Sequence, residues 1–160
     1  MDMVKKTWKP YVFFIALSEV VGILSGWLSR EGQALFSDTV VQPPLSPPGW
    51  VFPIAWTLLY ALMGIGAARV YSTPQGKDRS MGLNLFVVQL AVNFLWSPIF
   101  FNFGAYGFAF LWLLLLLALV LAMTWFFRKT DKVAAYLQLP YILWLLFAAY
   151  LNYGVWQLNR

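Results

Sequence analysis

Tryptophan supplies the chemically reactive side chains of this 160-residue chain, which contains nine Trp and no His or Cys. Without Cys there is no thiolate nucleophile, and without His there is no Ser-His triad and no imidazole ligand for a metal. The six carboxylates lie too far apart in the sequence to suggest a metal cage or an acid–base pair. We therefore expect no metal site and no required cofactor. The indole rings of tryptophan are the side chains expected to carry any redox chemistry. The carboxylates are Asp2, Glu19, Glu31, Asp38, Asp78 and Asp131.

The composition indicates an integral membrane protein. Hydrophobic residues make up 61% of the chain and charged residues only 11%, whereas soluble domains have about 25% charged residues. A soluble globule of this size needs more polar surface to cover its core. The net charge of +5 does not indicate nucleic-acid binding, because the basic residues lie between apolar blocks rather than in one patch.

Apolar blocks predict an all-α fold, a bundle of transmembrane helices in a single domain over residues 1–160. A spanning helix needs roughly 20 mostly apolar residues. Turn and charge signals separate five such blocks. The predicted spans are residues 10–28, 50–71, 81–101, 105–127 and 133–156.

The distribution of Lys and Arg predicts how the bundle is oriented. All of these residues except Arg30 and Arg160 lie in the N-terminal tail, in the second and fourth connections or, for Arg69, just before the second connection. With five spans these segments share one side, and the positive-inside rule makes that side cytoplasmic. We expect a multi-pass protein with its N-terminus inside and its C-terminus outside.

The long first connection, residues 29–49, is expected to be an irregular, stiff outer flap. Its Pro43-Pro44 and Pro47-Pro48 pairs cannot form helix. Long irregular segments in compact domains are usually functional. A lid over a ligand site is the favoured interpretation, and a permissive surface loop is the alternative.

Polar and aromatic residues recur at helical spacing beneath this flap. At about 1.5 Å per residue, those at positions 56, 93, 96, 144 and 148 lie roughly 8–18 Å from the outer ends of their spans. Amides that faced lipid would be unsatisfied, so we expect these faces to point inward. They form either a cavity with aromatic walls or a plain helix interface with amides bonding across it. The faces are Phe52, Trp56 and Tyr60; Gln89, Asn93 and Trp96; and Trp144, Ala148 and Asn152.

Glu19 lies at similar depth, where an ionised carboxylate is costly. A protonated, hydrogen-bonded Glu19 is favoured over a proton-coupling role. Small residues at i, i+4 spacing, Gly22 with Gly26 and Gly64 with Ala68, predict close helix contacts, either within the bundle or in a dimer.

Three stretches resemble the TspO/translocator protein family, also known as tryptophan-rich sensory proteins and peripheral-type benzodiazepine receptors. They are PPLSPPGWVFPIAWTLLY at 43–60, QLAVNFLWSPIFF at 89–101 and PYILWLLFAAYLNY at 140–153. Length, span number and motif order agree as well, so the resemblance covers nearly the whole chain.

The resemblance implies a bundle, commonly a homodimer, that binds porphyrins, isoquinoline- or benzodiazepine-type ligands and, in eukaryotic members, sterols. Some members are proposed to degrade protoporphyrin in light, which would make Trp56 and Trp144 catalytic. The resemblance also implies that the host membrane is a bacterial cytoplasmic membrane. The ligand-binding residues that it implies are Pro47, Phe52, Trp56, Tyr60, Asn93, Trp96, Trp144 and Ala148.

The chain also departs from the family pattern. Phe36-Ser37 stands where Trp-Tyr is common, Gln42 where Lys is common, and Leu45 where an aromatic residue is common. The sterol motif survives only as a remnant, Leu151 and Tyr153, because no basic residue follows at the required spacing. Cholesterol is therefore not the expected ligand.

Binding of tetrapyrroles by a membrane receptor, sensor or carrier is the favoured function. The usual axial ligands of haem iron, His and Cys, are absent, which favours metal-free porphyrin held by stacking and shape. A light- and oxygen-dependent porphyrin-degrading enzyme is the alternative. An ion-coupled transporter fits less well, because five spans cannot form two equal inverted repeats and no discontinuous helix pair is evident.

Overall fold

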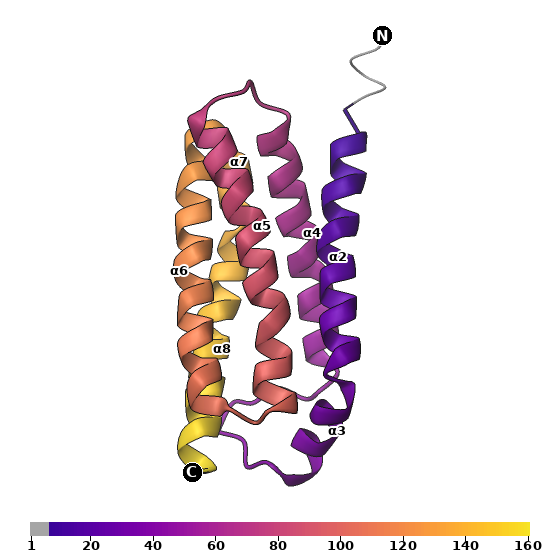
Figure 1. Cartoon of the computed structure of the whole chain (residues 1–160), viewed down its shortest axis with the longest axis vertical. Coiled ribbons are helices and arrows are strands. Elements are labelled where there is room, and N and C mark those ends of the chain that lie inside the picture. The colour runs from indigo at the N-terminus through magenta and orange to yellow at the C-terminus, as the bar shows by residue number, and fades with distance from the viewer. Residues whose placement is uncertain (1–6) are drawn as a thin grey trace.

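The computed structural model describes residues 7–160, and helices run side by side through most of this range (Figure 1). The long helices are α2 (Lys9–Leu28), α4 (Val51–Tyr71), α5 (Lys77–Ser97), α6 (Tyr106–Thr130) and α8 (Leu139–Leu158). Shorter elements are α3 (Arg30–Thr39), the π-helix η1 (Pro98–Asn102) and α7 (Lys132–Tyr136). In Figure 1, α3 lies across one end of the bundle.

Five segments of residues 7–160 are long and apolar enough to cross a membrane, which confirms the predicted all-α five-span bundle. The third span comprises α5 and η1, and the fifth comprises α7 and α8. Several helices extend past the apolar blocks, as α6 does to Thr130, because backbone hydrogen bonding continues after hydrophobicity ends. Lys5 and Lys6, used in the orientation prediction, lie outside the described residues.

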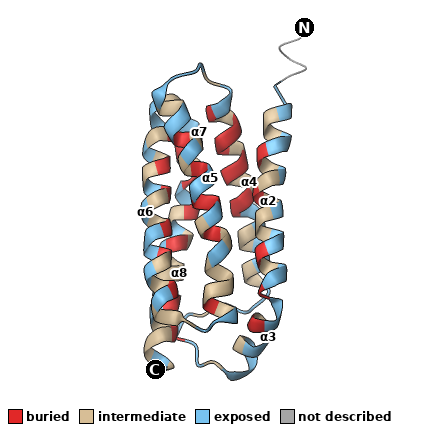
Figure 2. Ribbon diagram, in the orientation of Figure 1, coloured by how far each residue is buried: buried red, intermediate tan, exposed pale blue. Residues whose placement is uncertain are grey.

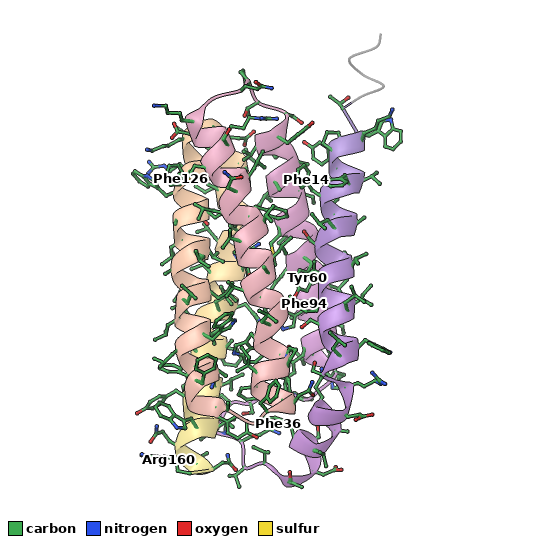
Figure 3. All side chains as sticks on the ribbon, viewed as in Figure 1. Phe14, Phe36, Tyr60, Phe94, Phe126 and Arg160 are labelled. Carbon is green, nitrogen blue, oxygen red and sulfur yellow. The ribbon has the colours of Figure 1, made fainter. Side chains whose placement is uncertain are left out.

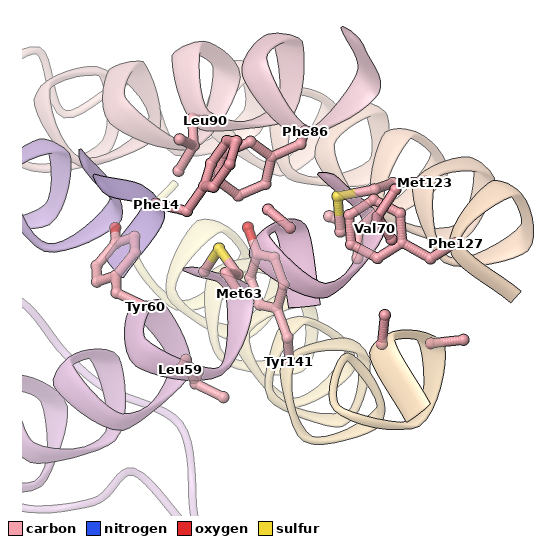
Figure 4. Packing of buried hydrophobic residues seen from close by; sticks show 14 of the residues in the cluster. Phe14, Leu59, Tyr60, Met63, Val70, Phe86, Leu90, Met123, Phe127 and Tyr141 are labelled. Atoms are coloured by element: carbon pink, nitrogen blue, oxygen red, sulfur yellow. The ribbon is translucent and has the colours of Figure 1, made fainter. Parts of the chain in front are cut away.

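The larger of the two buried hydrophobic clusters in residues 7–160 is centred away from α3. Every buried residue of α4 lies at or after Leu59, and Figure 2 shows this bias along the ribbon of α4. The core side chains, among them Met63, Phe86 and Tyr141, interdigitate between helices (Figure 4). Residues 51–58 of α4 therefore face something other than close-packed protein.

Glycines bring α2 and α4 into backbone contact. A Cβ on Gly64 would lie 2.5 Å from the Ile15 Cα, so no side chain fits there. At Gly22 a Cβ would overlap the ring of Tyr60, whereas a Cβ on Gly26 would meet no atom within 4 Å. Gly22 and Gly64 thus serve contacts within the bundle, one of the two predicted alternatives.

Pro98 changes the course of the third span. Because proline has no N–H, the Phe94 carbonyl loses its usual helical donor. The Ser25 hydroxyl on α2 donates to this carbonyl instead, at 2.7 Å. The helix then changes to the wider π-helical form in η1. At its end the Phe103 N–H donates to the Pro98 carbonyl, five residues earlier, at 3.1 Å. Gly104, with φ of 58°, makes the left-handed turn into α6.

The fifth span is discontinuous, which the sequence did not indicate. A turn at Leu137 and Gln138 separates α7 from α8, and Pro140 lies in the first turn of α8, where its missing N–H costs nothing. The buried Gln138 amide donates to the Ala134 carbonyl at 3.2 Å and so bridges the break.

The expectation that residues 29–49 are irregular is wrong for the first half, which forms α3. This stretch, REGQALFSDT, contains no proline and carries an acidic residue, Glu31, in its first turn, where it complements the helix dipole. Residues 40–50, which hold both proline pairs, are not helical. The flap is therefore a short helix followed by an extended segment.

A salt bridge fastens the end of the bundle opposite α3. Arg69 on α4 lies 3.1 Å from Asp131, between α6 and α7. Partial burial alone would raise the pKa of Asp131, but hydrogen bonds from the Ala134 N–H and the Arg69 guanidinium outweigh it, and the net pKa is lowered. Asp131 therefore caps α7 in its ionised form.

Candidate functional site

A cavity of about 610 Å³ lies in the half of the bundle next to α3. Its lining comes from α2, α3, the extended segment after α3, α4, α5, η1, α6 and α8. Ligand pockets typically measure about 300–1,000 Å³. This cavity explains why none of residues 51–58 of α4 is buried, since Phe52, Trp56 and Thr57 line it.

The structure brings the predicted ligand-binding residues together on this cavity. Those lining it are Pro47, Phe52, Trp56, Tyr60, Asn93, Trp96, Trp144 and Ala148. The two residues of the sterol-motif remnant separate: Leu151 lines the cavity, whereas Tyr153 is 48% exposed and packs beside the rings of Phe110 and Trp156. Residues two apart on a helix face different directions, so this motif does not form one site.

Aromatic rings from α4 and α8 form one wall. Phe52, Trp56 and Tyr60 recur at i, i+4 spacing and share a face of α4. The Trp56 ring lies 5.4 Å from Tyr60 and 6.3 Å from Trp144, and the Phe52 ring lies 5.9 Å from Trp144. These separations are typical of favourable aromatic pairs. The wall is thus apolar and preformed.

The tryptophans differ in what their indole N–H groups do. Trp96 donates to Asn152 Oδ1 at 3.1 Å, and Trp112 donates to the Val92 carbonyl at 2.8 Å. Within residues 7–160, the N–H groups of Trp56 and Trp144 donate no hydrogen bond. The cavity wall therefore presents two unused donors beside its apolar faces.

Buried hydrogen bonds fix the floor of the cavity. The Tyr60 hydroxyl donates to Asn93 Oδ1 at 2.5 Å, and Asn93 Nδ2 donates to the Tyr141 hydroxyl at 2.8 Å. Tyr141 in turn donates to Gln89 Oε1 at 2.8 Å. The inward orientation expected of Gln89 and Asn93 is confirmed. Figure 3 shows Tyr60 midway along the bundle, so this network separates cavity from core.

The extended segment after α3 forms the roof and is fastened to α8. Asn159 makes two hydrogen bonds with Val41: its Oδ1 accepts from the N–H at 3.0 Å and its Nδ2 donates to the carbonyl at 2.7 Å. The Tyr150 hydroxyl donates to the Pro44 carbonyl at 2.8 Å. Gly154 has no side chain where one would meet the Pro43 ring at 2.6 Å. The roof is thus held by the last helix.

The second wall was not anticipated from residue patterns. Phe36 on α3 lies 5.3 Å from Phe100 and 5.2 Å from Phe101, both on η1, and all three line the cavity. Gln33, Ser37 and Gln42 line it too. The amphipathic pattern of residues 30–39 is the sequence signal that indicates a helix here. It conflicts with the prediction of an irregular flap.

Glu19 also lines the cavity, about one turn from Gly22. It is partly buried, yet among the described residues it has no hydrogen bond or ion pair. The expected hydrogen-bond partner within the protein is therefore missing.

The cavity suits a flat, largely apolar ligand better than a metal ion. Residues 7–160 contain no group of three or more His, Cys, Asp or Glu side chains that could hold a metal. Aromatic faces and a few directional polar groups favour stacking with orientation by hydrogen bonds.

Comparison with known proteins gives the family. A model of the TspO/MBR family matches residues 14–157. The chain is 40% identical to protein CrtK of Rhodobacter capsulatus over 76% of this chain and 77% of that protein. It is 37% identical to the translocator protein of sheep, Ovis aries, over 96% and 92% of the two chains. It is 34% identical to the tryptophan-rich protein TspO of Chlorobaculum tepidum over 91% and 92%. The chain therefore belongs to the TspO/MBR family.

Proposed function

We propose that this membrane protein is a receptor or carrier for porphyrins and other flat apolar molecules, which it binds in the cavity beneath α3. The observation that carries the proposal is the wall formed by Phe52, Trp56 and Trp144, in a volume suited to a ligand of this size. The absence of His and Cys favours metal-free porphyrin. Isoquinoline- and benzodiazepine-type compounds would occupy the same space.

Titration of the purified protein with protoporphyrin in the dark tests this function. Stacking on Trp56 is expected to quench tryptophan fluorescence saturably. The Ala148→Thr variant is expected to bind several-fold more weakly, because the added bulk projects into the cavity. Ala149→Thr adds the same atoms one residue later, outside the lining, and is the control. Unsaturable quenching, or equal affinity of all three proteins, would contradict the proposal.

A second candidate function is oxidation of porphyrin in light by oxygen. It is favoured by the unpaired indole N–H groups of Trp56 and Trp144, which leave both rings free to contact a bound macrocycle. Indoles are the most easily oxidised side chains available in a chain without Cys. Analysis of products with a dark control separates this reaction from simple binding.

We also propose that α3 and the roof face outward across a bacterial cytoplasmic membrane, with the N-terminus inside. Basic residues near the opposite end, including Lys77, Arg79 and Lys129, support this orientation. A single cysteine at Asp38 is expected to react with a membrane-impermeant maleimide in intact cells, and one at Lys77 only after lysis. Reactivity in the reverse order would invert the topology.

A homodimer is part of the proposal, supported by the family resemblance. Gly22 and Gly64 are occupied by contacts inside the bundle, so the interface would use another face. Sedimentation in density-matched detergent measures the mass of the assembly.

A further inference from the structure

The cavity contains a single formally charged group. Of the residues that line it, all within the described range, Glu19 is the only Asp, Glu, Lys or Arg. No basic side chain reaches the lining to neutralise it. The two ion pairs of residues 7–160 join Arg69 to Asp131 and Lys129 to Asp78, near the opposite end of the bundle.

The position of Glu19 is defined by packing between α2 and α4. It lies one turn before Gly22, where the absence of a side chain lets the Tyr60 ring approach α2. Glu19 and Tyr60 both line the cavity. The carboxylate is therefore located beside the floor of the cavity, at the level of Tyr60 and Asn93.

Several polar groups that line the same cavity as Glu19 already donate hydrogen bonds within the protein. The Tyr60 hydroxyl and the Asn93 amide donate within the floor network. Trp96 donates to Asn152, whose amide donates to the Tyr106 carbonyl at 2.9 Å. Glu19 itself contributes acceptor capacity that no described residue uses, since a carboxylate offers about four lone-pair positions. A ligand complements this end of the cavity by bringing a donor.

We propose that Glu19 accepts a hydrogen bond from a protonated or proton-donating nitrogen of a flat aromatic ligand, so that the cavity selects nitrogen bases over hydrocarbons of the same shape. This inference rests on the proposed function of the cavity as a site for flat ligands. A carboxylate away from bulk water gains most from a charged donor, because charge-assisted hydrogen bonds strengthen when water is excluded. Acidic substituents of the ligand would be repelled from Glu19 and would point toward the roof.

The test compares two probes with the same three-ring outline, protonated 9-aminoacridine and neutral 9-methylanthracene. Binding is measured by equilibrium partition into nanodiscs that contain the protein, with empty nanodiscs subtracted. In Glu19→Gln the affinity for 9-aminoacridine is expected to fall at least about tenfold, while that for 9-methylanthracene changes less than about twofold. Retained binding of the hydrocarbon shows that the variant is folded.

Glu31→Gln is the matched control, because it makes the same chemical change on the exposed surface of α3, outside the lining. It is expected to leave both affinities unchanged. If 9-aminoacridine binding falls equally in the two variants, the loss reflects the lower negative charge of the protein as a whole. That result would overturn the inference. Unchanged binding in Glu19→Gln would overturn it while leaving the cavity as a ligand site. Failure of both probes and of protoporphyrin to bind the wild-type protein would overturn the proposed function as well.

Discussion

Replacing Gly64 with valine is expected to destabilise the bundle by about 3 kcal/mol or more, near the upper end of overpacking costs. A Cβ at this position would lie 2.5 Å from the Ile15 Cα and 2.6 Å from the Ile15 backbone nitrogen. Backbone atoms cannot rotate away as a side chain can, so α2 and α4 must separate. The measurement is unfolding in detergent with increasing SDS, followed by tryptophan fluorescence.

Gly26→Val is the control for this prediction. The same substitution on α2 places a Cβ with no atom within 4 Å, and valine is a slightly better helix former than glycine, so any destabilisation is expected to stay below about 1 kcal/mol. If the two variants unfold at the same SDS fraction, the close approach at Gly64 is not what holds α2 against α4.

Replacing Trp56 with phenylalanine is expected to abolish most light-dependent porphyrin breakdown while lowering affinity only about two- to tenfold. The substitution keeps an apolar ring near Trp144 and Tyr60 but removes ring area, the unpaired N–H and the more easily oxidised indole. Stacking contributes about 0.5–1.5 kcal/mol beyond burial, which sets the expected loss of binding. Affinity is measured in the dark and breakdown from product yield at saturating porphyrin.

Trp112→Phe is the matched variant, because it removes an indole that lies outside the cavity lining. It is expected to change neither affinity nor breakdown. A weaker affinity in Trp56→Phe together with an unchanged yield at saturating porphyrin would make Trp56 a wall of the cavity and not a reactant. Equal binding and equal breakdown in both variants would show that Trp56 does not contact the porphyrin.

Periodicity predicted those parts of the site that lie on regular helices. Phe52, Trp56 and Tyr60, like Trp144 and Ala148, reach the cavity because residues one turn apart must share a face. Burial of Asn93 was predictable from the cost of an amide in lipid. The same rules underlie the prediction of the spans themselves.

Features that depend on pairing across the sequence could not be predicted in this way. The helical state of residues 30–39 depends partly on packing, since Gly32 lies against the Phe101 backbone. The Ser25 bond to the Phe94 carbonyl needs both the proline at 98 and the approach of α2. Rules based on sequence patterns treat each span separately and therefore miss such contacts. The expected hydrogen-bond partner of Glu19 is also absent from the described residues.

The fastening of the roof to α8 has a consequence for the order in which the protein is made. Val41 and Asn159 are 118 residues apart in sequence. A ribosome adding about 5–20 residues per second takes roughly 6–24 seconds to cover that interval. When this interval begins α2 and α3 are already synthesised, and α4 follows early in it, but the residues that anchor their connection do not yet exist. The cavity is consequently among the last parts of the molecule to mature, and in a nascent chain stalled before Asn159 the segment after α3 would lack these two hydrogen bonds.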